Sequence, residues 1–370
     1  MHHGRLAQPV TILEARKGIG RTRKSAVFAI LTALLRAARR DLATFESVKV
    51  NNFFLFVALL IYGALVSGVK PRSAEPFLAF LGFLLLFPLS SDPLDRIPSG
   101  RLALWPLDSG QRFALRLASL ALSPVLWLTV AIMVLAAPVL ALSFLALAAG
   151  IQGAIVMGGR VAARAPVWNP QRHIPQVPGR LGGLIRIHVR EMLSLLDAYL
   201  ALLLSAAGTG YRVLAAHPDS EAFPILALLV ALALSTSAQC LFGLESDSGV
   251  SRYRLLPLGG WQILLAKDIA HLGVLLLLVL PVAPGPGLTF EFVALAIGHF
   301  PSTSRPTPQR RWRFTSGRLV FGVGQVVFGC MIGLAEHQQG SWFLLGAAAA
   351  WVCSLYWCGR SWEARKKGLV

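Results

Sequence analysis

Several ionisable residues lie within or beside apolar runs long enough to form membrane helices. Burying such a side chain in hydrocarbon is costly, so each one is by default a functional hypothesis. Two of them, Arg116 and Lys267, lie about one helical turn inside the cytoplasmic end of their runs, where long side chains are expected to snorkel to the surface. The intramembrane polar candidates are Arg116, Asp197, Lys267, Asp268, His271 and Glu291, with Glu336 near the end of a later run.

The acids and the histidine are expected in different environments. Asp197 lies one turn into its apolar run and is expected to face other helices of the protein. Asp268 precedes His271 by three residues, so the two side chains can share a helix face. Glu291 falls near the outer end of its run, where we expect water to reach it. No carboxylate is plainly placed at the middle of a run, which counts against a proton-coupled transporter.

Motifs for enzymatic chemistry are missing from the sequence. The eight histidines form no HExxH pattern, the four cysteines form no CxxC pair, and no GxSxG motif occurs. Residues 18–25 contain glycines and a Lys-Ser pair, but Arg23 stands where a phosphate-binding loop needs glycine. We therefore expect no catalytic, metal-binding or cofactor-binding residue on this chain, and no enzyme activity of the chain by itself.

The composition indicates the class of protein that holds these residues. Apolar residues make up 55% of the 370, and charged residues only 14%, which is about half of the usual share. This balance argues against a soluble enzyme and excludes a disordered chain. We predict an all-α, polytopic helical membrane protein.

Ten apolar runs approach the roughly 20 residues that cross a bilayer as a helix. The second and eighth are the shortest, because Gly82 and Pro88 interrupt the second and a Pro-Gly-Pro-Gly stretch precedes the eighth. The predicted spans are 52–69, 76–90, 113–135, 137–158, 192–209, 223–243, 263–281, 287–300, 319–336 and 341–359.

The basic residues predict the orientation of these spans. The chain has 35 Lys and Arg against 17 Asp and Glu, a net charge of +18. With a cytoplasmic N-terminus and ten spans, thirty of the 35 fall in cytoplasmic segments and three in outside loops. This asymmetry predicts an integral protein of a bacterial cytoplasmic membrane with both termini in the cytoplasm. It also explains the charge without nucleic acid, because anionic lipid headgroups are the expected partners of basic residues beside a membrane.

Two parts of the sequence resemble each other at a nearly constant offset. At offset 151, Arg101, Pro106, Leu107, Gln111 and Arg116 align with Arg252, Pro257, Leu258, Gln262 and Lys267. At offset 150, Leu34, Arg36, Arg40, Asp41 and Leu42 align with Leu184, Arg186, Arg190, Glu191 and Met192. Chance similarity between membrane-flanking segments is the alternative. A true repeat would be parallel, with an amphipathic basic helix, two spans, a Pro-Leu loop and two more spans in each half.

The basic segments 24–42 and 183–193 place apolar residues at helical spacing with arginines opposite. Each is expected to lie on the cytoplasmic leaflet, either as a simple anchor or as an elbow helix that moves with a transport cycle. The predicted organisation is 1–51, a cytoplasmic segment with the first amphipathic helix; 52–158, a first four-span unit; 159–191, a linker with the second amphipathic helix; 192–300, a second four-span unit; and 301–370, a basic loop, two spans and a cytoplasmic tail.

The run from Phe242 to Pro257 and Leu258, continuing to Asp268, resembles the permease subunits of ABC-2-type exporters. An acidic-Gly turn, an arginine, a Leu-Pro pair and an Ile-Leu-x-x-Lys stretch carry the resemblance, and the basic elbow 186–191 adds to it. It covers about 180–280 well and the first half weakly. Members of that family typically have six spans, so ten spans would be a departure that two fused permease halves could explain.

The resemblance implies that residues 244–262 form a coupling loop for a separate ATP-binding subunit, with 91–112 as its repeat. ATP-Mg would then be bound by that partner, and a homodimer of two copies of the chain is a possible assembly. Loop residues that would carry the coupling are Arg101, Pro106, Leu107, Glu245, Asp247, Arg252, Arg254, Pro257 and Leu258. Packing of these loops on the membrane surface is the alternative role. The alternative function is a secondary transporter or a membrane scaffold without an ATPase.

Overall fold

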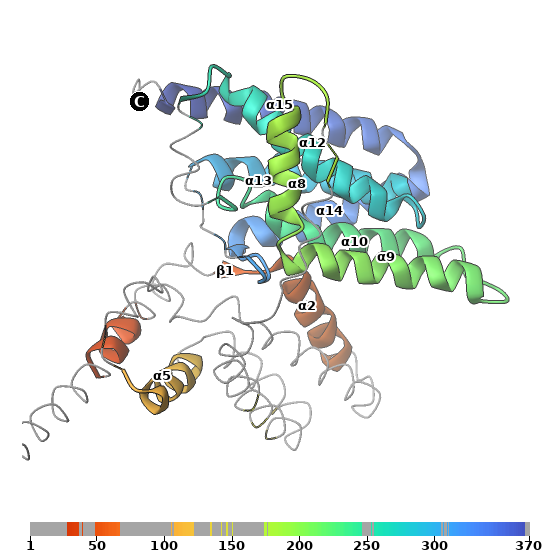
Figure 1. The fold of residues 1–370 in the computed structure, drawn as a ribbon. Coiled ribbons are helices and arrows are strands. Elements are labelled where there is room, and N and C mark those ends of the chain that lie inside the picture. Colours follow the sequence, from red (N-terminus) through yellow and green to blue (C-terminus); the bar gives the residue numbers. More distant parts are fainter. Residues whose placement is uncertain are drawn as a thin grey trace, which may run out of the picture. The chain divides into compact units, whose positions relative to one another are not determined.

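A computed structural model describes residues 28–36, 39, 49–66, 105, 107–121, 134, 142, 146, 150, 174–175, 177–245, 253, 255–304, 306, 309 and 311–366. The described part is mainly helical (Figure 1). Internal contacts divide the chain into two compact units. The first unit is Met1–Ala43 with Ser91–Ala165, and the second is Thr44–Ser90 with Pro166–Val370.

In the first unit, residues 28–36 and α5 (Ser109–Ala121) are helical. Ile30 and Leu34, one turn apart on the first helix, are buried in a cluster with Leu107 and Leu115. This burial agrees with the amphipathic pattern predicted over 24–42. Phe28 of the same apolar stretch is exposed, so the buried face is narrower than the predicted one.

The second unit begins with a short strand pair that joins distant parts of the chain. β1 (Lys49–Val50) pairs antiparallel with β2 (Gly317–Arg318), with Lys49 opposite Arg318. The strands directly precede two helices, so the pair holds their starts together. The described helices of this unit are α2 (Asn52–Val66), α8 (Gly182–Met192), α9 (Leu196–Leu214), α10 (Ala222–Ala238), α12 (Gly260–Val279), α13 (Pro284–Ser304), α14 (Leu319–Gln339) and α15 (Trp342–Lys366).

Helix α13 is the central element of the second unit, because it packs against α10, α12, α14 and α15 (Figure 1). It begins at Pro284, and proline suits a first helical position because its missing N–H has no partner to lose. Gly298 allows the close approach of α10, since a Cβ there would lie 2.8 Å from the Ala238 carbonyl oxygen. Small residues at such contacts are typical of membrane helices.

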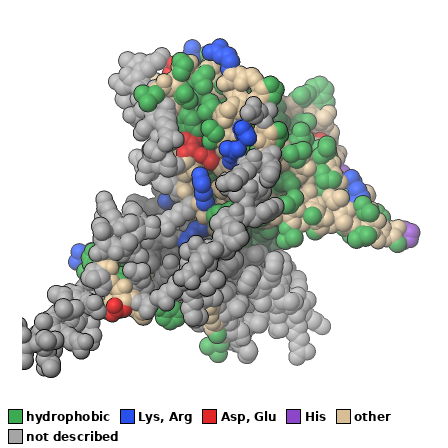
Figure 2. Space-filling model, viewed as in Figure 1, with side chains coloured by type: hydrophobic (Ala, Val, Ile, Leu, Met, Phe, Trp, Pro, Cys, Tyr) green, Lys and Arg blue, Asp and Glu red, His purple; other side chains and the backbone are tan. Residues whose placement is uncertain are grey.

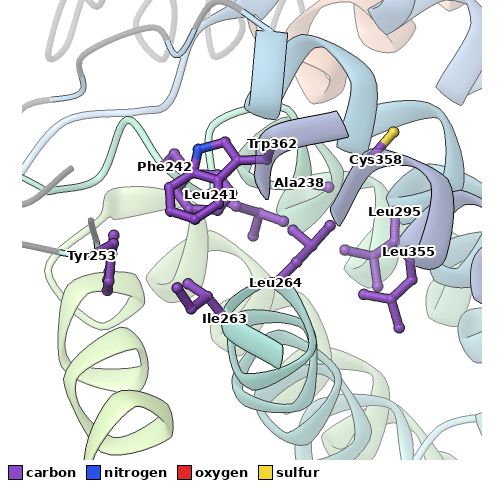
Figure 3. Packing of buried hydrophobic residues seen from close by; sticks show 10 residues of the cluster. All are labelled: Ala238, Leu241, Phe242, Tyr253, Ile263, Leu264, Leu295, Leu355, Cys358 and Trp362. Atoms are coloured by element: carbon purple, nitrogen blue, oxygen red, sulfur yellow. The ribbon is translucent and has the colours of Figure 1, made fainter. Parts of the chain in front are cut away.

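An aromatic and aliphatic cluster joins α10, α12 and α15 (Figure 3). Phe242 stacks on Trp362 with ring centroids 5.3 Å apart, and Tyr253 meets Phe242 edge-on at 6.0 Å. Leu184 of α8 and Leu258, which lies just before α12, pack against the same cluster. The segment between α10 and α12 is therefore bound to the helices on both sides of it.

Three described helices, α12, α14 and most of α15, are long and apolar enough to cross a membrane. Helices α8 and α9 meet this test only together, and they are bent by 80° at their junction. Apolar side chains cover much of the surface of α9 and α10, where charged and histidine side chains gather only near the loop that joins them (Figure 2). These helices are those of an integral membrane protein.

The helices agree in position with most of the predicted spans. Each predicted span from 192 onwards overlaps one helix, and 52–69 overlaps α2. The 80° bend between α8 and α9 separates an amphipathic helix from an apolar one, as the predicted elbow requires. The span 76–90 lies outside the described residues, as do the second half of 113–135 and most of 137–158. The number of ten spans stays a prediction.

Candidate functional site

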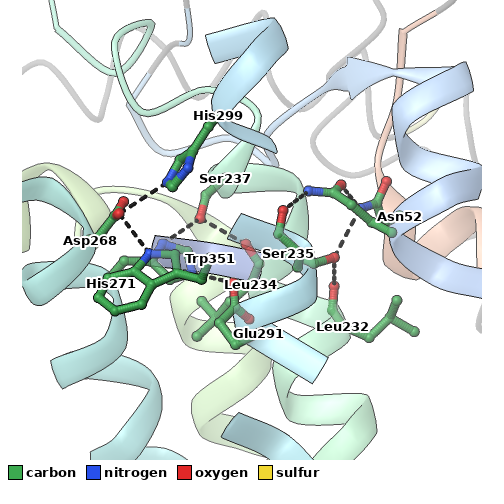
Figure 4. Close-up of polar contacts among 12 residues, drawn as sticks. Asn52, Leu232, Leu234, Ser235, Ser237, Asp268, His271, Glu291, His299 and Trp351 are labelled. Atoms are coloured by element: carbon green, nitrogen blue, oxygen red, sulfur yellow. Dashed lines mark hydrogen bonds and ion pairs between the residues drawn. The ribbon is translucent and has the colours of Figure 1, made fainter. Parts of the chain in front are cut away.

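Two carboxylate–histidine pairs join α12 to α13 in the interior of the second unit (Figure 4). His271 Nε2 lies 2.7 Å from Glu291 Oε1, and His299 Nε2 lies 3.0 Å from Asp268 Oδ2. Each helix contributes one acid and one histidine, in reciprocal order. All four side chains are fully buried. Asp268 and His271 do lie three residues apart on α12, but each binds a partner on α13 instead of the other.

The burial of Glu291 differs from the sequence-based expectation, which placed water around it. Helix α13 begins at Pro284, three residues before the predicted span, so Glu291 lies two turns inside the helix and faces α12. His271 lies halfway along the 20-residue α12. The Glu291 carboxylate therefore meets a histidine near the middle of α12, while Glu291 itself lies in the first half of α13.

A serine oxygen lies near Nδ1 of each histidine, the ring nitrogen that does not face the carboxylate. Ser237 of α10 donates its hydroxyl hydrogen to the Leu234 carbonyl at 2.7 Å, and its oxygen faces His271 Nδ1 at 3.4 Å. Ser354 of α15 donates to the Ala296 carbonyl at 2.7 Å, and its oxygen lies 3.0 Å from His299 Nδ1. With both hydroxyl hydrogens donated to these carbonyls, the serine oxygens are left as acceptors, which favours the tautomer of each ring that has a hydrogen on Nδ1.

The combination of serine, histidine and carboxylate has the residue types of a hydrolase triad, but not its geometry. In a hydrolase the serine hydroxyl donates to the imidazole, which raises its nucleophilicity. Here Ser237 donates to a backbone carbonyl and is itself buried. The two sets can bind and exchange protons, but their serines are not activated for attack.

The pairs differ in the number of donors around the acid. Asp268 Oδ2 also accepts the indole N–H of Trp351 at 2.8 Å, whereas Glu291 has His271 as its one hydrogen-bond partner among the described residues. The second oxygens, Asp268 Oδ1 and Glu291 Oε2, are buried and have no hydrogen-bond partner in the described part of the chain. Such atoms are rare in native interiors and call for an explanation.

Lys267 does not snorkel. Its ammonium group is almost fully buried, donates to the Leu241 carbonyl at 2.8 Å, and forms an ion pair with Glu245. Tyr253 donates its hydroxyl hydrogen to the same carboxylate. The sequence-based expectation failed because it considered α12 alone, whereas Glu245, at the start of the 244–262 loop, brings a counter-ion to the lysine.

The Lys267 ammonium also lies 5.0 Å from the ring centroids of both Phe242 and Tyr253. Burial, followed by the negative charge of Glu245, raises the pKa of the Tyr253 phenol above its usual value, so this hydroxyl stays protonated and keeps donating. Glu245 near the start of the loop and Tyr253 at its middle are thus anchored to one point on α12.

Helix α8 packs against the same helix, α12. Its His188 is buried, and Nδ1 of that ring lies 3.4 Å from Glu191 Oε2 one turn further along. Lys267 and His271 of α12 also interact electrostatically with His188. The elbow helix and the predicted coupling loop therefore meet on one spanning helix.

Asp197 faces the protein interior, as predicted. Its carboxylate accepts hydrogen bonds from the Asn51 side chain at 2.7 Å and from the Thr315 backbone N–H at 2.7 Å. The Thr315 hydroxyl adds a third donor at 3.0 Å. Asp197 thus joins the start of α9 to the segments before α2 and α14, which is a structural role.

Sequence reasoning missed a second buried polar network. The Asn52 amide donates to Ser235 Oγ at 2.9 Å and to Gln325 Oε1 at 2.7 Å. Gln239 donates to the same Gln325 oxygen at 2.7 Å. Uncharged amides within apolar runs carry little signal in a search for ionisable residues. A search for Asn and Gln in predicted spans would have found Gln325.

The two matched segments share a hydrogen bond between a glutamine side chain and the backbone at the repeat offset of 151. The Gln111 side-chain oxygen accepts the backbone N–H of Asp108 at 3.1 Å just before α5, and Gln262 does the same for Gly259 at 3.0 Å just before α12. Helices α5 and α12 begin at Ser109 and Gly260, which are also 151 residues apart. Satisfying a free N–H at a helix start is a local stabilising feature, so both matched segments start a helix in the same way.

The remaining coupling-loop candidates divide by exposure. Pro257 is exposed, whereas Leu107 is buried and Leu258 is half-buried. Leu255, which is not among the candidates, is 85% exposed. Trp261, at the start of α12, is 40% exposed. An exposed apolar stretch therefore precedes α12. The candidates outside the described residues are Arg101, Pro106, Asp247, Arg252 and Arg254, and the side chain of Arg116 also lies outside them.

Among the described residues, no group of three His, Cys, Asp or Glu side chains is arranged to hold a metal ion. The four cysteines are free thiols. The Cys240 thiol is fully buried. The chain matches no protein-family model, no curated protein sequence and no solved structure.

Proposed function

We propose that this chain is the transmembrane permease subunit of an ABC-2-like exporter, in which a separate ATPase subunit drives movement of a substrate across the membrane. The observation that supports this most is the attachment of the 244–262 loop to α12. Glu245 forms an ion pair with the buried Lys267, Tyr253 donates a hydrogen bond to the same carboxylate, and α8 packs on α12. A force applied to the loop by a partner would reach a spanning helix through a buried ion pair.

The loop also presents a surface for such a partner. Leu255 and Pro257 are exposed, and two arginines, at 252 and 254, shortly precede Leu255 in the sequence. Apolar and arginine side chains together are typical of binding hot spots. In this proposal the chain has ten spans with both termini in the cytoplasm of a bacterium, 91–112 is a second coupling loop, and the permease works as a homodimer among anionic lipids.

The test is ATP hydrolysis by a complex purified from the native membrane through a tag on this chain. We expect vanadate-sensitive ATPase activity to co-purify, and Leu255→Asp to lower it at least about tenfold, equivalent to about 1.4 kcal/mol of binding. The matched control is His217→Asp on the exposed α9–α10 loop, which the topology places on the other side of the membrane. Purified complexes without ATPase activity, or equal activity in Leu255→Asp, would contradict the proposal.

One observation favours the alternative of a secondary transporter. The buried acids and histidines of α12 and α13 are the residue types of proton relays in pumps and transporters. Transport by the purified chain in liposomes without ATP would support this alternative over the ABC-2-like exporter.

A further inference from the structure

The two carboxylate–histidine pairs of α12 and α13 are separate from the contacts that join the loop to α12. Ionisable groups in a membrane interior are expensive, and four of them lie here within two adjacent helices. Asp268, His271, Glu291 and His299 are each 0% exposed. A purely structural polar contact between helices needs only amides and hydroxyls, as the Asn52–Gln325 contact demonstrates.

The hydrogen bonds determine how many protons each pair holds. Nδ1 of His271 carries a hydrogen that points to Ser237, so its Nε2 either lacks a hydrogen or carries the one that makes the ring cationic. The 2.7 Å separation between Nε2 and Glu291 Oε1 requires one shared proton. The pair is then neutral overall, whether the proton resides on nitrogen or on oxygen. The same reasoning applies to His299 and Asp268.

A second proton position exists in each pair. Glu291 Oε2 and Asp268 Oδ1 point into the interior and have no hydrogen-bond partner among the described residues. We propose that the two pairs form a proton-binding site, in which these oxygens take up and release protons as α12 moves relative to α13. The site goes beyond ATPase coupling, because it links the packing of two helices to proton occupancy.

The proton balance of one cycle is simple. A proton from water forms an O–H bond at Glu291 Oε2, the shared proton stays on His271 Nε2, and the pair changes from neutral to a charge of +1. Release of the same proton to water reverses the step, and no other reactant is consumed. Because the two pairs are arranged reciprocally, sliding of α12 along α13 breaks both of them, so helix position and protonation influence each other.

The groups around the site are mostly uncharged. Ser237 of α10 and Trp351 and Ser354 of α15 contact the pairs directly. Lys267 lies beside Asp268 in sequence, but its charge is matched by Glu245. His188 of α8 is a further titratable group near the site, together with its partner Glu191, and the charge of His271 acts on it. With Lys267 paired to Glu245, an additional proton changes the net charge of this interior.

The test is infrared difference spectroscopy of the full chain in lipid nanodiscs, between about pH 8 and about pH 5, the range in which histidine pairs titrate. We expect a carboxylic-acid C=O band to grow on acidification and to shift in D₂O. Glu291→Gln and Asp268→Asn should each remove part of this band, and the buried Asp197 and half-buried Glu191 are expected to supply the remainder. The matched control is Glu221→Gln, which removes the acid of an exposed pair with His337 at 3.2 Å; it should leave the band unchanged.

A misfolded variant could also lose the band, so a second variant keeps both acids. His271→Gln is expected to retain the band of Glu291 while changing its frequency, because the imidazole no longer shares the proton. Circular dichroism should show unchanged helix content. The inference is overturned if the native chain shows no such band, or if Glu291→Gln and Asp268→Asn both keep the native spectrum. The outcome is independent of the Leu255 test, since no ATPase is present.

Discussion

Helices α12 and α14 have the same mean hydropathy over a membrane-length window, yet 56% of that window is buried in α12 and only 28% in α14. Helix α12 is surrounded by α8, α10, α13 and α15 and holds three ionisable side chains. Helix α14 presents Phe328 and Met331 to its surroundings. Mean hydropathy therefore identifies helices that can enter a membrane, but the placement of polar residues distinguishes those enclosed by protein from those that face lipid.

The two helices also pack by different means. Helix α12 is held by ion pairs and hydrogen bonds, whereas α14 combines the hydrogen bonds of Gln325 with close glycine contacts. A Cβ at Gly329 would lie 2.7 Å from Phe290, and one at Gly333 would lie 2.5 Å from Leu228. Close glycine contacts gain van der Waals packing where the hydrophobic effect between helices is weak in lipid. Perturbing each kind of contact sharpens the comparison.

The largest effect is expected for Lys267→Met in α12. This change leaves the Glu245 carboxylate buried without its cation, and breaking a buried pair in this way costs about 3–5 kcal/mol. The measurement is reversible unfolding of the purified protein in mixed detergent micelles. The double variant Lys267→Met with Glu245→Gln removes both charges and should recover most of the loss. Native stability of Lys267→Met would show that the pair is not enclosed.

A smaller effect is expected for Gly329→Ala in α14. The added methyl group meets the Phe290 ring, and overpacking of this kind costs about 1–3 kcal/mol. The matched control is Gly346→Ala in α15, where nothing lies within 4 Å of the new Cβ. This control should be neutral or stabilising by up to about 1 kcal/mol, because alanine favours a helix over glycine. The same assay applies, and equal effects of the two variants would argue against the α13–α14 contact.

The smallest effect is expected for Phe328→Ala on the outer face of α14. Phe328 is 54% exposed, so its truncation should change the unfolding free energy by less than about 0.5 kcal/mol. Val326→Ala, two residues away on the buried face, is the control and should lose more stability although it removes fewer atoms. A larger loss for Phe328→Ala would mean that this face contacts protein, as a homodimer interface would.

Several features were predictable because their signals are local. Apolar run length located the helices from α9 onwards, since a run of that length can bury itself only as a helix in this setting. Helical spacing predicted the elbow helix α8, and the offset of 151 predicted that α5 and α12 begin at matched positions. The interior location of Asp197 also followed from its place in an apolar run.

The pairing of the polar side chains was not predictable in the same way. His271 and Glu291 are 20 residues apart, and Asp268 and His299 are 31 apart, with a turn between the two helices. Which side chains meet depends on the rotation and the register of α12 against α13. Neither quantity has a local signal, because both arise from the contacts of α13 with α10, α14 and α15 at the same time.

The sequence by itself determined that this is a helical membrane protein, where most of the described helices lie, and which ionisable residues enter apolar surroundings. Those conclusions follow from composition and periodicity, because water and lipid select which apolar and polar stretches of the chain they surround. The tertiary structure decided that Lys267 is enclosed with Glu245, that Glu291 is fully buried, and that two acids and two histidines form reciprocal pairs. The physical reason is that a charge in a low-dielectric interior is stable only beside a specific partner, and packing alone brings distant partners together.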